Sequence, residues 1–402
     1  MTDLAFQDLA FCDQKDKIIV SFLDIFYVAF AKKTLEKIAP FSIDKHTITF
    51  DCSPKRAEHK FNSLLSTALQ HDLKNKITGR KTIYIHKDSG IPLIGTNYFG
   101  IVDRGSSLLE LKPITGCNLT CCYCSVDEGP HSKTRMVDFV VEADYLIAET
   151  SKVIAYKGID GIEIHIGCQG EPLLYKNLEQ LITGLHALKQ VSVISMDTNG
   201  VMLTEEKVDS LIKAGLNRFN VSLNAISQEI ATKIAGTYSN EKVLKIAAYI
   251  AQKTSLILTP VWIFGMNDSE IPKILEFAKK LKASIGIQNF LCYKFGRNPV
   301  KEKSFEEFYA ELKRLEKKYH VKLIHTAADF TIKPAKELPK PFKKGDTIDA
   351  VIMCEGRLAH EMLAVAQDRV IAIQHCTEKI GKRVMVRILR SKHNIFTGIL
   401  RK

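Results

Sequence analysis

Strand-like and helix-like patterns of apolar residues alternate along the middle of the chain. Short apolar runs bounded by turn residues predict strands, and apolar residues three or four positions apart predict amphipathic helices. The expected strands are 108–112, 161–166, 191–196, 217–223, 255–264 and 285–291. The expected helices are 136–156, 178–188, 204–214, 241–252, 272–282 and 305–319. Six strand–helix units predict an α/β fold, with a parallel sheet and helices outside it.

Two local signals mark helix ends in this region. Gly215 follows the helix expected at 204–214, as is usual at a helix C-terminus. Ser304 and Glu307 have the spacing of a capping box at the start of the last helix. Six units are fewer than the eight of a complete TIM-type barrel, so we expect a partial (β/α)6 barrel. Its open side would admit a large substrate.

The two ends of the chain show other patterns. In the first hundred residues, 20–32 and 55–76 have helical spacing, whereas 47–51 and 82–86 resemble strands. After a Pro- and Lys-rich stretch, five short strand patterns predict a small β-barrel at 347–354, 362–366, 369–375, 383–389 and 395–400. The expected division is an N-terminal α+β accessory domain at 1–104, the partial barrel at 105–330, a linker at 331–341 and the β-barrel at 342–402. Such a linker predicts domains that fold independently.

One short run carries the clearest chemistry. Cys117, Cys121 and Cys124 are spaced C-x3-C-x2-C, and three thiolates on one loop can hold three irons of a cubane iron–sulfur cluster. The fourth iron then stays open to a small molecule. A ferredoxin would normally add a fourth cysteine at similar spacing, and a zinc site would add a second pair of cysteines or histidines. A zinc loop or a chance group of buried cysteines remains the alternative. Cys122 should point to the other side.

With Tyr123 before its last cysteine, this loop resembles that of the radical S-adenosylmethionine (SAM) superfamily. The resemblance implies a [4Fe-4S] cluster whose open iron is chelated by the amino and carboxylate groups of SAM. It also implies reductive cleavage of SAM to methionine and a 5′-deoxyadenosyl radical, which takes a hydrogen atom from the substrate. The cofactors would carry this chemistry, so no catalytic side chain is expected beyond them. An electron donor such as ferredoxin or flavodoxin would be a partner.

The same resemblance suggests where SAM is held. In barrels of this kind the chemistry lies at the C-terminal ends of the strands. A Gly-Gly-Glu-type element after the second strand offers carbonyl groups and a carboxylate to the SAM ammonium; here Gln169 replaces its first glycine. Polar residues after the next three strands would complete the site. The cofactor-binding residues implied are Gly170, Glu171, Thr198, Asn199, Ser222, Asn224, Gly265 and Asn267. After the third to fifth strands, ordinary turns or helix caps explain such residues equally well.

Charge points to a polyanionic partner. The net charge is +12, and residues 342–402 hold twelve lysines and arginines against six aspartates and glutamates. This segment resembles a TRAM-type RNA-binding barrel. The resemblance implies phosphate contacts from Lys382, Arg383, Arg387, Arg390, Lys392 and His393. The alternative is a capping barrel with a solvated basic face.

Other features limit location and function. Charges interrupt every apolar stretch, so no membrane helix is expected, and the acidic start is unlike a signal peptide. Ten cysteines with one thiolate loop indicate a reducing cytoplasm rather than a disulfide framework. The leading hypothesis is a radical SAM enzyme, a transferase or oxidoreductase, that modifies RNA, with tRNA preferred. The alternatives are modification of a peptide or protein, and a non-enzymatic RNA-binding protein with a structural or redox-sensing cluster.

Overall fold

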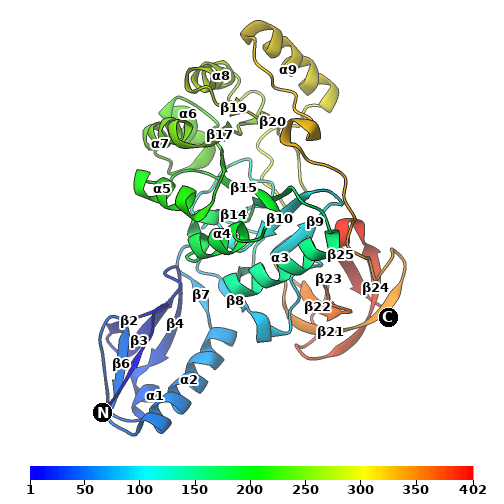
Figure 1. The fold of residues 1–402 in the computed structure, drawn as a ribbon. Helices are drawn as coiled ribbons and strands as arrows, with labels where there is room; N and C mark the ends of the chain where they lie inside the picture. Colours follow the sequence, from blue (N-terminus) through cyan, green and yellow to red (C-terminus); the bar gives the residue numbers. More distant parts are fainter. Residues whose placement is uncertain (402) are drawn as a thin grey trace.

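A curved seven-stranded sheet forms the centre of the computed structural model, which describes residues 1–401 (Figure 1). The strand order is β19-β17-β16-β15-β13-β10-β9. Six of these strands run parallel, and β9 is antiparallel to β10. The strands are β9 (Gly100–Asp103), β10 (Leu108–Lys112), β13 (Ile162–Ile166), β15 (Val191–Thr198), β16 (Arg218–Val221), β17 (Ser255–Leu258) and β19 (Ser284–Ile285). The expected partial barrel of six parallel strands is confirmed.

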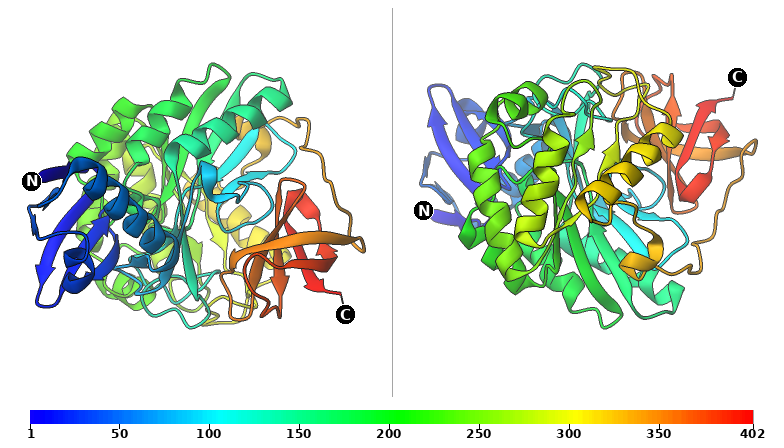
Figure 2. Two further views of the ribbon diagram at one scale, coloured as in Figure 1. Left: turned by 90° about the horizontal axis from the view of Figure 1, so that it is seen from below. Right: turned by 90° about the horizontal axis from the view of Figure 1, so that it is seen from above.

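Helices cover the outer face of this half-barrel (Figure 2). They are α3 (Ala143–Lys157), α4 (Leu178–His186), α5 (Glu205–Ala214), α6 (Gln228–Ala235), α7 (Asn240–Lys253), α8 (Glu270–Leu281) and α9 (Phe305–Tyr319). Thr204 caps α5 by accepting a hydrogen bond from the Lys207 N–H, and Gly215 ends it in a left-handed conformation. The predicted capping box of Ser304 and Glu307 is present at the start of α9. Helix α6 was not anticipated from the sequence.

The N-terminal residues build two further sheets. One has the order β12-β8-β7-β4-β3-β2 and the other β1-β6-β5. The strands are β1 (Thr2–Ala5), β2 (Leu9–Gln14), β3 (Lys17–Phe22), β4 (Phe26–Ala31), β5 (Phe41–Ile43), β6 (Thr47–Phe50), β7 (Lys74–Asn75), β8 (Lys81–Ile85) and β12 (Val137–Val141). Helices α1 (Lys32–Glu36) and α2 (Pro54–His71) belong to the same region, and α2 buries Phe61 against the sheets.

Two helix predictions are wrong. Residues 20–32 form most of a β3–β4 hairpin, because Leu23 and Asp24 both have positive φ angles and close a tight turn between aromatic-rich strands. The helix expected from 136 begins only at Ala143. Before it, β12 is buried along its whole length and pairs in parallel with β8 of the N-terminal sheet. A strand buried on both faces lacks the alternation that would identify it.

The C-terminal strands close into a five-stranded barrel, as expected. Its order is β21-β22-β23-β25-β24. The strands are β21 (Thr347–Glu355), β22 (Met362–Ala366), β23 (Arg369–Gln374), β24 (Arg383–Arg390) and β25 (Phe396–Leu400). Ile352, Ile371, Val386 and Phe396 fill its interior. Buried and exposed positions alternate along β24, and such alternation made this strand predictable from the sequence.

The remaining elements are short. Four two-residue strands pair as β11 (Thr115–Gly116) with β14 (Gln169–Gly170), and β18 (Val261–Trp262) with β20 (Gln288–Asn289). Single 3-10 turns lie at Lys87–Ser89, Pro172–Leu174, Ala327–Phe330 and Lys392–Asn394. Among residues 1–401, no helix has the length and apolar character needed to cross a membrane.

The C-terminal barrel is packed tightly against the rest of the chain. Cys354, Leu363 and Val370 of the barrel belong to the same apolar core as the half-barrel. The Val370 N–H donates to the Ile94 carbonyl at 2.9 Å, and the Phe396 N–H donates to the Gly95 carbonyl at 2.8 Å. Two main-chain bonds and a shared core join the barrel to the rest of the chain, and independent folding of the two parts stays a prediction.

Gly95 provides a test of this docking. It has a φ of +130°, and a Cβ placed there would lie 2.2 Å from the Val370 carbonyl oxygen. We expect Gly95→Ala to lower the free energy of unfolding by about 1–3 kcal/mol, because main chain cannot move aside as a side chain can. Gly345→Ala is the matched control, since Gly345 also has a positive φ but no atom within 4 Å of such a Cβ. Equal decreases in thermal stability of the two variants would mean that only backbone strain matters.

Candidate functional site

A cavity of about 320 Å³ contains the thiols of the cysteine motif. Cys117, Cys121 and Cys124 line it, together with a fourth thiol, that of Cys168. Five of the eight expected SAM-binding residues lie on the same walls: Gly170, Glu171, Thr198, Asn199 and Ser222. Residues from the cysteine loop and from the ends of successive barrel strands are therefore brought together.

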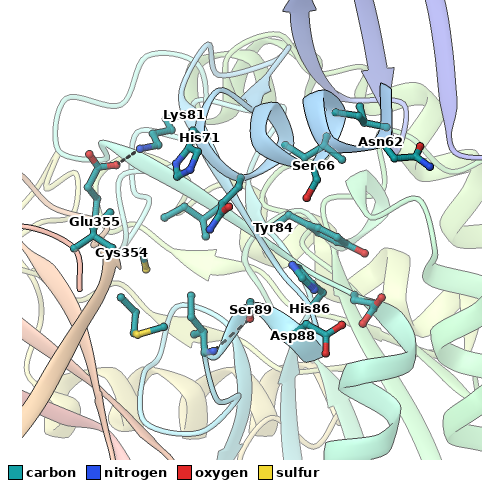
Figure 3. A pocket seen from close by; sticks show the side chains of 18 residues that line it. Asn62, Ser66, His71, Lys81, Tyr84, His86, Asp88, Ser89, Cys354 and Glu355 are labelled. Carbon is teal, nitrogen blue, oxygen red and sulfur yellow. Dashed lines mark hydrogen bonds and ion pairs between the residues drawn. The ribbon is translucent and has the colours of Figure 1, made fainter. Parts of the chain in front are cut away.

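A larger cavity, about 610 Å³, lies between α2, β8 and β21 (Figure 3). Tyr84 and His86 stack on one another there, with ring centroids 5.3 Å apart, and Lys81 forms an ion pair with Glu355 at 2.7 Å. None of the expected site residues lines it. Volume alone does not define chemistry, so the smaller cavity with the thiols is the candidate site.

A close approach of two main-chain segments brings the cysteine loop beside Glu171. Gly116 of β11 pairs with Gly170 of β14. A Cβ at Gly170, whose φ is +157°, would lie 2.0 Å from the Gly116 carbonyl oxygen. The Glu171 N–H then donates to that same carbonyl at 2.9 Å. Only glycine fits at position 170, and the carboxylate is fixed one residue beyond this contact.

Main-chain groups point at two of the three sulfurs. The Leu119 N–H donates to Cys117 Sγ at 3.4 Å, and the Glu128 N–H donates to Cys124 Sγ at 3.2 Å. Burial raises the pKa of all three thiols, that of Cys121 to about 12. Without a metal the thiols are therefore protonated, and ligation must release those protons. Hydrogen bonds to sulfur favour the thiolates that a cluster needs.

The donor set fits an iron–sulfur cluster better than a single ion. Within residues 1–401, no three Cys, His, Asp or Glu side chains converge as ligands of one metal ion. A zinc ion would need such a point of convergence. In a cubane cluster each thiolate binds a different iron, so three spaced thiols on one cavity wall suit it. Cys122 faces elsewhere, against the apolar group of Ile234, Ile263 and Phe290.

Glu171 is buried and strongly hydrogen-bonded. Its carboxylate accepts from the Thr198 hydroxyl at 2.7 Å, the Asn199 N–H at 2.8 Å and the Leu173 N–H at 3.1 Å. The last contact also caps the 3-10 turn at Pro172–Leu174. Burial nevertheless raises the pKa of Glu171 to about 7. A cationic ligand in the cavity would offset that cost and favour the ionised form.

Asp197 is a cavity residue to which the sequence assigned no role. It lies one position before Thr198, and its carboxylate contacts His165 Nε2 at 3.1 Å and accepts from Asn220 Nδ2 at 3.0 Å. Burial opposes ionisation of both partners, but the Asp197 carboxylate raises the pKa of His165. Burial also opposes ionisation of Asp197, but the His165 ring outweighs this effect and lowers the pKa of Asp197. The pair therefore keeps an anionic oxygen at the cavity wall.

Three expected SAM-binding residues do not line the cavity. Asn224 donates to the Tyr123 hydroxyl at 2.6 Å and accepts from the Val261 N–H at 2.8 Å. Buried Asn267 donates to the Asn224 carbonyl at 3.0 Å. Gly265 occupies a turn with a φ of +85°. Asn224 and Asn267 thus join the strand ends to the cysteine loop through Tyr123.

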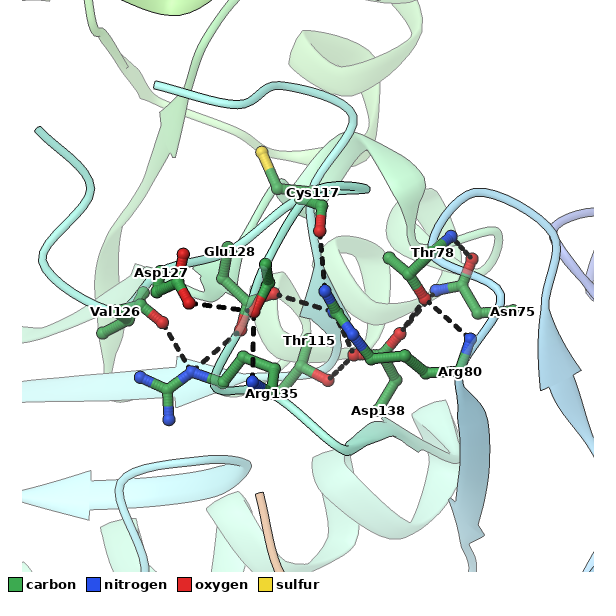
Figure 4. Close-up of polar contacts among 12 residues, drawn as sticks. Asn75, Thr78, Arg80, Thr115, Cys117, Val126, Asp127, Glu128, Arg135 and Asp138 are labelled. Carbon is green, nitrogen blue, oxygen red and sulfur yellow. Dashed lines mark hydrogen bonds and ion pairs between the residues drawn. The ribbon is translucent and has the colours of Figure 1, made fainter. Parts of the chain in front are cut away.

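Buried charges support the cysteine loop (Figure 4). The Glu128 carboxylate lies 3.6 Å from Arg80 and 4.0 Å from Arg135, and Arg80 also contacts Asp138 at 3.4 Å. From another segment, Arg297 donates to Asp127 at 2.7 Å, to the Cys121 carbonyl at 3.0 Å and to the Glu128 carbonyl at 2.7 Å. Nothing in the sequence indicated Arg80 or Arg297, because their partners are distant along the chain.

The expected RNA-contacting residues lie on the C-terminal barrel and not at the cavity. Arg383, Arg387 and Arg390 are on β24 and are exposed, as are Lys382 and Lys392, while His393 is half-buried. Two of these charges are already paired, Lys382 with Glu378 and Arg383 with Asp349. Among residues 1–401, no carboxylate pairs with Arg387 or Arg390.

Comparisons with known proteins relate the chain to one sequence family. Residues 111–278 match the sequence family described as the radical SAM superfamily. An uncharacterized protein of Methanocaldococcus jannaschii is 39% identical in an alignment of 392 positions that covers 89% of this chain and 90% of that protein. A GTP 3′,8-cyclase of Chlorobaculum tepidum is 29% identical over 198 residues, 49% of this chain and 56% of the cyclase, so this chain spans about half of the cyclase's length. A structure of TYW1 with a lysine-pyruvate adduct bound is 18% identical, has a TM-score of 0.41, and covers 76% of this chain and 94% of that one.

Removal of the three motif cysteines should abolish the metal centre. We expect the triple variant Cys117→Ala, Cys121→Ala, Cys124→Ala to contain no iron after anaerobic reconstitution and to cleave no SAM. Cys122→Ala and Cys168→Ala are the matched controls and should keep iron, because a three-thiolate cluster does not need them. Iron analysis and visible absorption give the answer. A triple variant that retained the cluster, or a Cys168→Ala variant without it, would contradict this ligand set.

SAM affinity should depend on the ionisation of Glu171. Below its pKa of about 7 the buried carboxyl is neutral, so an ammonium group binds it poorly. Affinity of the cluster-loaded protein should therefore increase from about pH 6 to about pH 7.5, by up to about tenfold per pH unit below the pKa. This range stays below the pH at which the ligand's own α-amino group gives up its proton, at about 7.7–8.0. Glu171→Gln should bind weakly and without this slope in calorimetric titrations. The same slope in the variant would assign the dependence to another group.

Proposed function

This chain belongs to the radical SAM superfamily of enzymes, whose cofactors are a [4Fe-4S] cluster and SAM, and we propose that its substrate is a structured RNA, preferably a tRNA. The proposal rests mainly on one observation, the exposed basic face of strand β24 on the C-terminal barrel. The non-enzymatic alternative is not retained, because the superfamily consists of enzymes.

We propose that Cys117, Cys121 and Cys124 bind three irons of the cluster, which leaves the fourth for SAM. When bound, the cluster and SAM together supply an electron and a radical able to abstract hydrogen. The Glu171 carboxylate would receive the SAM ammonium beside the Gly170 main chain, while Thr198, Asn199 and Ser222 supply polar groups. Asn224, Gly265 and Asn267 do not line the cavity and would act indirectly, by fixing the strand ends that border it.

The chain itself would supply positioning and exclusion of water. Glu171 is already held by Thr198 and by the Asn199 main chain, so it needs no reorientation when a cation arrives. Its burial makes an ammonium contact worth more than it would be in water. Asp197 presents an anionic oxygen on the same wall. A ligand that offers N–H or O–H groups would satisfy it.

Several features of the C-terminal barrel support an RNA substrate. Along β24, basic Arg383 and Arg387 alternate with exposed Met385 and Leu389, which gives a strip of cations interleaved with apolar side chains. Phosphates attract such cations without sequence preference, and exposed apolar groups can lie against sugars or bases. Lys392 and His393 extend the basic character beyond the strand. We propose residues 342–402 as the RNA-binding unit.

We further propose that the enzyme works in a reducing cytoplasm with a ferredoxin or flavodoxin as electron donor. All ten cysteines are free thiols, which suits a reducing compartment. A small electron carrier fits because the superfamily requires a single low-potential electron. A peptide or protein substrate is the competing hypothesis, in which the basic barrel would serve for docking only.

The basic face can be tested by charge removal. The variant Arg383→Gln, Arg387→Gln, Arg390→Gln should bind tRNA more weakly, with a salt slope lower by about 0.7–0.9 for each phosphate that is no longer neutralised. SAM binding and iron content should be unchanged, because these side chains lie outside the cavity. The matched control removes three exposed cations from α9, by Lys313→Gln, Lys317→Gln and Lys318→Gln, and should leave affinity nearly unchanged.

Substrate identity needs a separate measurement. Mass spectrometry of nucleosides from a deletion strain should reveal a missing RNA modification that returns with the intact gene and not with the β24 variant. Unchanged RNA affinity in the β24 variant would remove the basis of the proposal. A complete set of RNA modifications in the deletion strain would favour the peptide or protein hypothesis.

A further inference from the structure

Arg357 is a buried cation that the C-terminal barrel contributes to the interior of the protein. It follows β21, in the connection to β22, and its side chain is fully buried. It is the largest of the fully buried side chains. Buried arginines are rare unless they are paired, so its partners indicate what it does.

Its guanidinium contacts both ends of the cysteine loop. Nη1 donates to the Thr115 hydroxyl at 3.1 Å, and Thr115 lies two residues before Cys117. Nη2 forms an ion pair with the Glu128 carboxylate, and Glu128 lies four residues after Cys124. Nη1 also donates to Asp138 at 2.7 Å and to the Val137 carbonyl, at the start of β12. One planar group from the barrel therefore joins the two ends of the loop.

The contact with Glu128 leads directly to a sulfur. The Glu128 N–H is the group that donates to Cys124 Sγ at 3.2 Å. The next residue, Gly129, has its carbonyl held by Arg80 at 2.6 Å. A Cβ at Gly129 would lie 1.9 Å from the Leu119 carbonyl oxygen, so the two main-chain segments approach closely there and leave no room for a side chain. Residues 128 and 129 are thus each held by a buried arginine, beside the N–H that points at the Cys124 sulfur.

Other cations do not replace Arg357 at this point. Arg80 and Arg135 lie 3.6 Å and 4.0 Å from the Glu128 carboxylate, beyond ordinary hydrogen-bond distance. Arg297 contacts main-chain carbonyls and Asp127 from another side. Removing Arg357 would leave two buried carboxylates, Glu128 and Asp138, with fewer charge partners. The loop would then relax toward water at the end that carries the N–H to sulfur.

We propose that Arg357 is a positioning residue for the cluster, through which the C-terminal barrel sets the geometry of the cysteine loop and the hydrogen bond to the Cys124 sulfur. Hydrogen bonds to ligand sulfurs are among the features that set the reduction potential of an iron–sulfur cluster. The barrel therefore takes part in the redox site, whatever it binds on its outer face. This role depends on the cluster but not on an RNA substrate.

The test uses the full-length, anaerobically reconstituted protein. Arg357→Met should lower iron affinity by about 10- to 100-fold, the usual range when a residue that orients a ligand is removed. In Arg357→Lys the charge remains but the bridge between Thr115 and Glu128 is broken, so the cluster should form with a changed reduction potential and a changed EPR spectrum. Arg369→Met is the control, since Arg369 is a half-buried barrel arginine bonded to Asn394 and Pro339.

The outcomes separate positioning from stability. A purely structural role would lower the melting temperature of the Arg357 variants and leave the potential and EPR spectrum of the folded protein unchanged. That result in Arg357→Lys would overturn the proposal, even if Arg357→Met does not fold. Changes in Arg369→Met equal to those in Arg357→Lys would also overturn it. If the β24 variant loses RNA binding and keeps the wild-type reduction potential of the cluster, the result bears on the proposed RNA substrate and not on the role of Arg357.

Discussion

The candidate site depends on one close contact between two stretches of main chain. Gly116 directly precedes Cys117, and Gly170 directly precedes Glu171; these glycines pair across β11 and β14. The pairing is possible only because residue 170 has no side chain, since a Cβ there would overlap the Gly116 carbonyl oxygen. Thiol and carboxylate therefore open into the same cavity, although more than fifty residues separate them.

The cysteine loop itself has little regular structure, since residues 117–136 contain no helix or strand. Its shape comes instead from buried charge pairs that connect it to other segments. Moving two charges from water into a protein costs more free energy than their attraction usually returns, so such pairs contribute a defined geometry rather than net stability. A loop that must hold three sulfurs in a fixed arrangement benefits from such defined geometry, even where the pairs add no net stability. Asp127 illustrates it, because one carboxylate joins Arg297 to the main chain at Lys133 and Thr134.

Much of the fold could be predicted because its signals are local. The helix end at Gly215, the capping box of Ser304 and the alternation along β24 each involve neighbours within a few residues. The failures lie where tertiary contacts decide. Residues 20–32 have an apolar spacing that fits a helix, but two positive φ angles at Leu23 and Asp24 turn them into a hairpin. Strand β12 exists because β8, more than fifty residues earlier, offers it an edge.

The candidate site also has a part that the sequence predicts and a part that depends on tertiary contacts. Cysteine spacing pointed to three thiols that share the cavity, and five of the eight residues expected at the strand ends line it too. Spacing could not indicate what supports them. Arg80 comes from the N-terminal sheet region, Arg297 from the far edge of the half-barrel, and Arg357 from the C-terminal barrel, and all three converge on the loop around Glu128. The sequence assigned no chemistry to the first hundred residues and only RNA binding to the last sixty. Both regions nevertheless contribute charged side chains that contact the cysteine loop. A redox site of this kind is encoded by the whole chain, with the motif supplying only its ligands.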